Sequence, residues 1–207
     1  MNLVFLASFI ALIIVISTTV KRQARNKKKA DAEFWARENR ANFVRNKPLD
    51  DLNYIKIPLE SFPTHLLNDD PEVLECIDIL QTLTSQKIVN LTGWSNTDLK
   101  LEYGTGNISI LSEYDQNYTV LVRTLQKWAD ALLKADYKKE ASVLMEFAVS
   151  TGTDIGRTYY QLADYWNAQG EWAQVDRLIN SAENLRSSNK DIIIKNLRSR
   201  SLLNMDS

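Results

Sequence analysis

A repeat of 34 residues constrains the fold of this chain more than any other feature. From Tyr114 onward, large apolar and small residues recur at that offset. The aligned pairs are Leu125 with Tyr159, Trp128 with Leu162, Ala129 with Ala163, Leu132 with Trp166, Ala141 with Val175, Met145 with Ile179, and Ala148 with Ala182. Large side chains at this spacing fill the groove between paired helices, and alanines let two backbones approach closely. Each copy of the repeat therefore predicts two helices packed against each other.

These copies, at about 122–155 and 156–187, resemble two tetratricopeptide repeats. The run Gly170-Glu171-Trp172 is similar to that family's turn into its second helix, while Ala141 and Ala148 match its small-residue positions. The chain departs from the family pattern at two positions, which are Asp136 in place of the usual turn glycine and Val175 in place of a small residue. The resemblance implies an α-solenoid domain.

Two such repeats bury little core by themselves, so we expect helices to cap both ends. A helix at 189–203 carries apolar residues among basic ones and predicts the C-terminal cap. At the other end, Asp70 followed by Pro71 is typical of a helix start, because Asp accepts free N–H groups and Pro suits the first turn. We assign 70–207 to one helical domain.

An apolar run from Leu3 to Val20, LVFLASFIALIIVISTTV, precedes this domain. About 20 helical residues at 1.5 Å each cover the roughly 30 Å hydrocarbon layer of a bilayer. Positive charge follows the run rather than preceding it, and no small-x-small cleavage site comes after it. Residues 1–20 therefore predict a single-pass transmembrane signal anchor, with the lipid bilayer contacted through residues 3–20.

A basic cluster follows the anchor directly. Its members are Lys21, Arg22, Arg25, Lys27, Lys28 and Lys29. The positive-inside rule then predicts an N terminus outside and a C-terminal domain in the cytoplasm of a cell (inner) membrane. We expect the cluster to lie at the membrane surface, beside anionic headgroups. Residues 30–207 carry an excess of about seven negative charges, which makes them a poor candidate for binding nucleic acid.

Two less regular regions separate the anchor from the repeats. Residues 21–47 predict a basic flank and juxtamembrane helix, and the prolines of 48–69 predict an extended segment. Residues 86–112 are the least periodic part, although Ser95 and Asp98 resemble a capping box for a short helix. Two interpretations of this region remain open, a structured connector and a binding loop.

Few residue types for metal or redox chemistry are present. Cys76 is the single cysteine and His65 the single histidine, so we expect no disulfide, no metal site and no cofactor. Glycosylation sequons begin at Asn90, Asn107 and Asn117, and we discount them because the predicted orientation is cytoplasmic. An enzyme with a site in 86–112 is an alternative, and its candidate carboxylates are Asp98, Glu102 and Glu113.

The anchor, its basic flank, the prolines between Pro48 and Pro63 and the stretch NLTGWSNTDLKLEYG together resemble an uncharacterised family of single-span membrane proteins from clostridial-type bacteria. That resemblance implies an inner-membrane location and no activity. The layout of an anchor followed by a helical domain is also similar to import receptors of the mitochondrial outer membrane, which gives a second interpretation.

We therefore predict a mostly α-helical, non-catalytic, membrane-anchored interaction module for an unidentified protein or peptide partner. The first helix of each repeat would form its concave surface. The candidate partner-binding residues are Arg123, Gln126, Lys127, Asp130, Arg157, Tyr160, Gln161 and Asp164. Because Arg123 recurs as Arg157 and Asp130 as Asp164, the pattern favours a groove that selects carboxylate-bearing segments.

Overall fold

The computed structural model describes residues 3–202, excluding the side chains of residues 3–11, 14 and 202, and this part of the chain contains helices and no strand. The α-helices are α1 (Leu3–Ala41), α2 (Pro71–Leu83), α3 (Asn96–Tyr103), α4 (Ile108–Lys134), α5 (Lys138–Ser150), α6 (Gly156–Ala168), α7 (Trp172–Glu183) and α8 (Lys190–Leu202). Two short 3₁₀ turns, η1 (Leu59–Ser61) and η2 (Thr105–Asn107), complete the secondary structure. The mostly helical fold class is confirmed.

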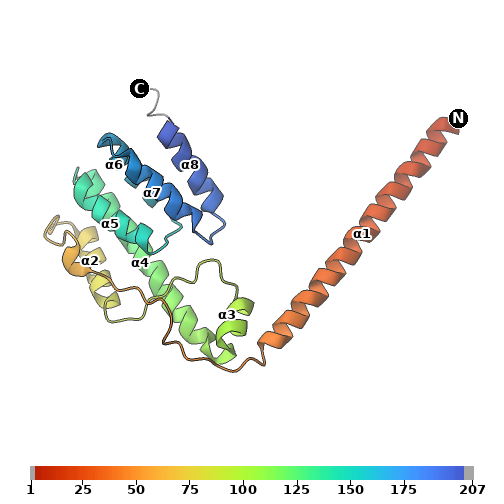
Figure 1. Ribbon diagram of the computed structural model, residues 1–207, viewed down its shortest axis with the longest axis horizontal. Helices are drawn as coiled ribbons and strands as arrows, with labels where there is room; N and C mark the ends of the chain where they lie inside the picture. The colour runs from red at the N-terminus through yellow and green to blue at the C-terminus, as the bar shows by residue number, and fades with distance from the viewer. Residues whose placement is uncertain (1–2, 203–207) are drawn as a thin grey trace. The chain divides into compact units, whose positions relative to one another are not determined.

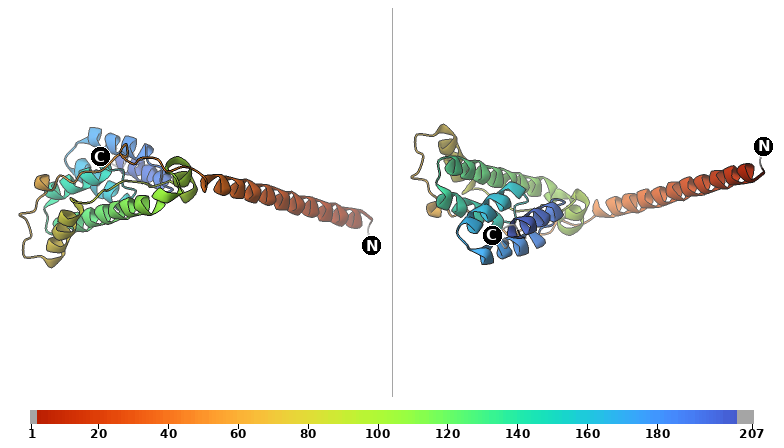
Figure 2. Two further views of the ribbon diagram at one scale, coloured as in Figure 1. Left: turned by 90° about the horizontal axis from the view of Figure 1, so that it is seen from below. Right: turned by 90° about the horizontal axis from the view of Figure 1, so that it is seen from above.

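The chain forms two compact units. Unit 1 comprises the chain up to Pro48 together with Ser95–Ile108. Helix α1 runs without a break, as both views of Figure 2 show, so the helix predicted after the basic cluster is continuous with the apolar run. Helix α3 packs on its C-terminal end, where Glu38 accepts hydrogen bonds from Lys100 and Thr97. The capping box of Ser95 and Asp98 is present at the start of α3, as predicted.

The predicted anchor lies in the first half of α1, and most of its side chains fall outside the described residues. Among the residues that were described, no helix is both long enough and apolar enough to cross a bilayer. The transmembrane part of the predicted fold is therefore without support from the structure and stays a prediction.

Unit 2 comprises Leu49–Trp94 and the described residues from Ser109 onward, including α2 and α4–α8. Helices α5, α6, α7 and α8 follow one another across the unit, and α8 packs against both α6 and α7 (Figure 1). The repeat extends into α8 as well, because equivalent positions of α4, α6 and α8 are fully buried. One set of equivalent residues is Leu125, Tyr159 and Ile193, and the other is Ala129, Ala163 and Leu197. Helix α8 thus has the burial pattern of α4 and α6.

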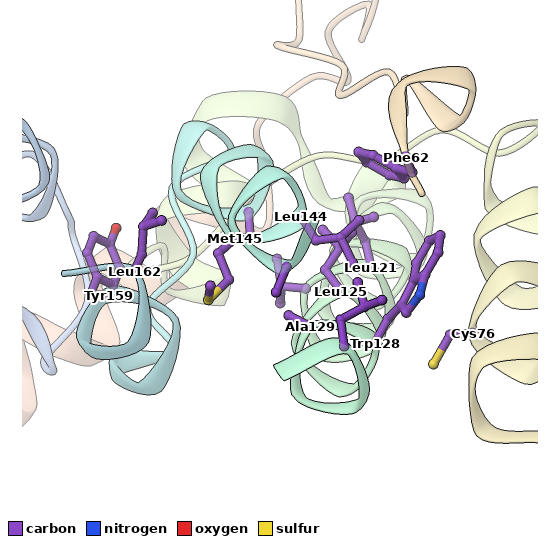
Figure 3. Packing of buried hydrophobic residues seen from close by; sticks show 14 of the residues in the cluster. Phe62, Cys76, Leu121, Leu125, Trp128, Ala129, Leu144, Met145, Tyr159 and Leu162 are labelled. Atoms are coloured by element: carbon purple, nitrogen blue, oxygen red, sulfur yellow. The ribbon is translucent and has the colours of Figure 1, made fainter. Parts of the chain in front are cut away.

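One hydrophobic core joins these helices, and Figure 3 shows the indole of Trp128 between Phe62 and Cys76. The ring of Phe62 contacts those of Trp128 and Phe147 edge to face, at centroid distances of 6.1 and 5.4 Å. The proline-containing segment therefore contributes to the core through Phe62. The side chain of Cys76 is 1% exposed, and desolvation raises the pKa of its thiol to about 11, as expected for a structural rather than a reactive cysteine.

Residues 86–94, which we name the strap, connect several turns of unit 2. The amide nitrogen of Asn90 donates hydrogen bonds to the carbonyls of Thr151 (2.9 Å) and Gly152 (3.1 Å), in the turn between α5 and α6. Gly93 lies directly against Arg186, in the turn between α7 and α8. The strap is therefore a structured connector.

Candidate partner-binding surface

The eight predicted partner-binding residues lie on α4 and α6, the first helices of the two repeats. Arg123, Lys127 and Asp130 form a stripe along the more accessible side of α4, at the i, i+4 and i+7 spacing of one helix face. Arg157, Gln161 and Asp164 form the corresponding stripe on α6. The geometry therefore brings the predicted residues onto neighbouring helices.

A polar network connects these two helices. Gln126 is 8% exposed, and its amide nitrogen donates to the side-chain oxygen of Gln161 at 2.7 Å. Its oxygen accepts a hydrogen bond from Thr158 at 2.6 Å. A single oxygen of Asp130, Oδ1, accepts hydrogen bonds from Gln126 (3.0 Å) and Gln161 (2.8 Å) and pairs with Arg157 (3.1 Å). Because buried polar groups are costly unless they are paired, this network favours one register of α6 on α4.

On the other side of α4, Lys127 forms ion pairs with two glutamates of α2. Its ammonium lies 2.6 Å from Glu75 and 3.9 Å from Glu72. The hydrogen bond with Glu75 raises the pKa of Lys127. Exposed ion pairs of this kind contribute little stability, about 0–1 kcal/mol.

Tyr160 and Asp164 contact α8 rather than α4. The guanidinium of Arg200 lies 4.7 Å from the centre of the Tyr160 ring, and its Nε donates to Asp164 at 3.0 Å. Asn196 donates to the Tyr160 hydroxyl at 3.2 Å. Together with the contacts above, these bonds form what we call the inter-helix ladder, which runs from α2 through α4 and α6 to α8.

Most of the predicted binding residues are thus engaged by neighbouring helices. Arg123 differs, because it is exposed and makes no hydrogen bond or ion pair with any described residue. Arg157 remains 62% exposed beside Asp130, and the side chain of Asp164 remains 61% exposed beside Arg200. These three side chains are the most accessible charged groups of the predicted set.

Sequence reasoning missed the partners of the ladder, namely Glu75, Thr158, Asn196 and Arg200. One signal could have found those on α8. Extending the 34-residue offset once more aligns Ile193 and Leu197 with the buried positions of α6, which would have placed α8 beside it. No comparable signal marks Glu75.

The other candidate residues are located as follows. All six basic residues of the predicted membrane surface are exposed along α1. Asp98 completes the capping box and pairs with Arg37, and its pKa is lowered chiefly by the hydrogen bond from Ser95. Glu102 pairs with Lys47 at 2.8 Å, while Glu113 is exposed. Within the described residues, no group of three or more His, Cys, Asp or Glu side chains could hold a metal ion.

Comparison with known proteins adds no relative. No protein-family model matches the chain, and neither a curated protein nor a solved structure gives a significant match.

Proposed function

We propose that this protein is a membrane-tethered, non-catalytic scaffold whose tetratricopeptide-like domain binds a partner protein. The observation that carries the proposal is the row of first helices, α4, α6 and α8, bridged by the inter-helix ladder. A ladder of this kind pre-organises neighbouring helices, so that a partner does not have to order them on binding.

The chemistry of the proposed surface comes from Arg123 and Arg157. They occupy the same repeat position on α4 and α6, and both guanidinium groups are accessible. Guanidinium groups bind carboxylates through paired hydrogen bonds, so this pair suits a partner segment that carries Asp, Glu or a C-terminal carboxylate.

The tether is the apolar run of residues 3–20, continued by the exposed basic cluster along α1. Under the positive-inside rule, the cluster favours a cytoplasmic position for the domain. The acidic balance of residues 30–207 supports a domain that anionic headgroups repel rather than attract.

Crosslinked purification from native membranes tests this proposal. The full chain with Arg123→Ala and Arg157→Ala should recover at least about tenfold less of the carboxylate-bearing partner, the loss expected for one or two charge-assisted bonds. Lys138→Ala with Lys139→Ala, which removes two charges from α5, is the matched control and should recover normal amounts. Unchanged recovery by the arginine variant would disprove the assigned surface, provided that its thermal unfolding matches the control.

A further inference from the structure

A groove of about 400 Å³ lies between α5 and α7, the second helices of the two repeats, with α6 beneath it. Leu162 and Leu178 are buried at its floor, and Trp166 is half-buried beside them. The groove is lined by other helices than the row proposed to bind the partner. It is therefore a second accessible surface of unit 2.

The two walls of this groove carry opposite charges that have no ionic partner among the described residues. Glu146 projects from α5, and partial desolvation raises its pKa. Arg177 projects from α7, and its hydrogen bond goes to Gln174 on the same helix, at 3.2 Å. An acid and a base on opposite walls make the surface complementary to itself after a two-fold rotation.

We propose that this groove is the interface with a second copy of the chain, in which Glu146 of each copy pairs with Arg177 of the other. A two-fold interface brings residue i against residue j twice, so one acid and one base per copy give two ion pairs. Exposed apolar surface adds contact area, since Val143 lies one turn before Glu146 on α5. The assignment goes beyond the proposed scaffold function and does not depend on it.

Cysteine crosslinking of the full chain tests the interface. The background is favourable, because the single native cysteine, Cys76, is buried and its thiol pKa is about 11. Ser150→Cys and Ser181→Cys place thiols on the α5 and α7 walls of the groove, and Ser199→Cys places one on an exposed site of α8. The proposed pairing sets α5 of one copy against α7 of the other, so mild oxidation of a mixture of the Ser150→Cys and Ser181→Cys chains should give a disulfide-linked dimer. A mixture of the Ser150→Cys and Ser199→Cys chains should give far less. Equal yields for the two mixtures would refute the interface.

Charge exchange made in both chains of the Ser150→Cys and Ser181→Cys mixture then tests the pairing itself. Glu146→Arg or Arg177→Glu alone should lower the association constant of the dimer about tenfold, because the ion pairs are lost and like charges repel each other. The double exchange restores the pairs and should recover most of the dimer. Asp176→Arg, on α7 but outside the groove lining, is the matched control. If the single reversals have no effect, if the double exchange restores nothing, or if the purified wild-type chain sediments as a monomer, the inference is wrong.

Discussion

Asp136 and Gly170 occupy the same position in the two repeats, and they share one backbone conformation. Their φ angles are +66° and +73°, both in the left-handed region. An L-residue there costs roughly 1 kcal/mol, although Asp tolerates it better than most residues do. Asp136 therefore differs from the residue type of the repeat pattern, but its turn has the same backbone conformation as the one at Gly170.

Replacing Asp136 by glycine should consequently stabilise the protein. We expect Asp136→Gly to raise the free energy of unfolding by about 0.5–1 kcal/mol, since glycine adopts this conformation without strain. The exposed pair of Asp136 with Lys138 contributes too little to offset that gain. Urea denaturation measures the change. The reciprocal variant Gly170→Asp should lower stability by a similar amount, and equal stability of both variants and wild type would contradict the prediction.

Each of the three sequon asparagines has a structural role. Each side-chain amide nitrogen donates to backbone carbonyls, from Asn90 to the α5–α6 turn, from Asn107 to Lys47 and Tyr103, and from Asn117 to Lys87. A glycan would replace a hydrogen on that nitrogen and disturb these bonds. The geometry therefore gives a physical reason for each asparagine that is independent of glycosylation.

The position of the strap depends on how closely Gly93 approaches Arg186. Its φ angle is +84°, and a Cβ there would lie 2.6 Å from Cβ of Arg186 and 2.7 Å from its carbonyl oxygen. Both the backbone conformation and the contact distance require glycine at this position.

Gly93→Ala should therefore lower the free energy of unfolding by about 2–4 kcal/mol, through backbone strain plus a backbone clash. Gly170→Ala is the matched control. Its φ angle is +73°, but nothing lies within 4 Å of the added Cβ, so only the strain of roughly 1 kcal/mol applies. Chemical denaturation compares the two variants. Equal losses would show that the strap does not need the close approach.

The docking of α3 on α1 should depend on pH. The hydrogen bond from Lys100 lowers the pKa of Glu38, and the one from Ser95 lowers that of Asp98. A carboxylate whose folded pKa lies below its unfolded value stabilises the folded state above about pH 4 and loses this effect as the pH falls through the folded value.

Amide resonances of α3 should accordingly stay constant from about pH 7 to 5 and shift toward unfolded values below about pH 4. The variant Glu38→Gln should show weaker docking at neutral pH and a smaller change on acidification. Resonances that remain native at about pH 3 would contradict this account.

Local patterns predicted the elements far better than the contacts between them. Asp70-Pro71 and the capping box of Ser95 and Asp98 mark helix starts because the interacting groups are near neighbours in sequence. The ladder was not predictable in this way. Gln126 and Gln161 meet only because α6 packs on α4 in one register, and an amide that binds a neighbouring helix looks the same in sequence as one that faces a partner.

The distribution of charge along the chain is the feature that the sequence shows most directly. Six basic residues lie together on α1, while the rest of the chain beyond them is acidic. The proposed orientation in the membrane depends on this asymmetry.

Replacing Lys27, Lys28 and Lys29 by glutamine should therefore produce a mixture of orientations, because half of the positive-inside signal is lost. Protease protection of closed membrane vesicles measures which side carries the domain. Replacing Lys138 and Lys139 instead should leave the orientation unchanged. A uniform orientation of the triple variant would show that other features determine the topology.

The strap also has a consequence for how the chain folds. Solenoids usually gain and lose structure one repeat at a time, because each repeat contacts only its neighbours. Here Asn90 and Gly93 bind turns that lie far along the chain, after α5 and after α7. Such distant pairings raise the contact order, which slows folding relative to a simple helical array. They also couple the two repeats, so we expect unit 2 to unfold in a single cooperative transition rather than one repeat at a time from α8.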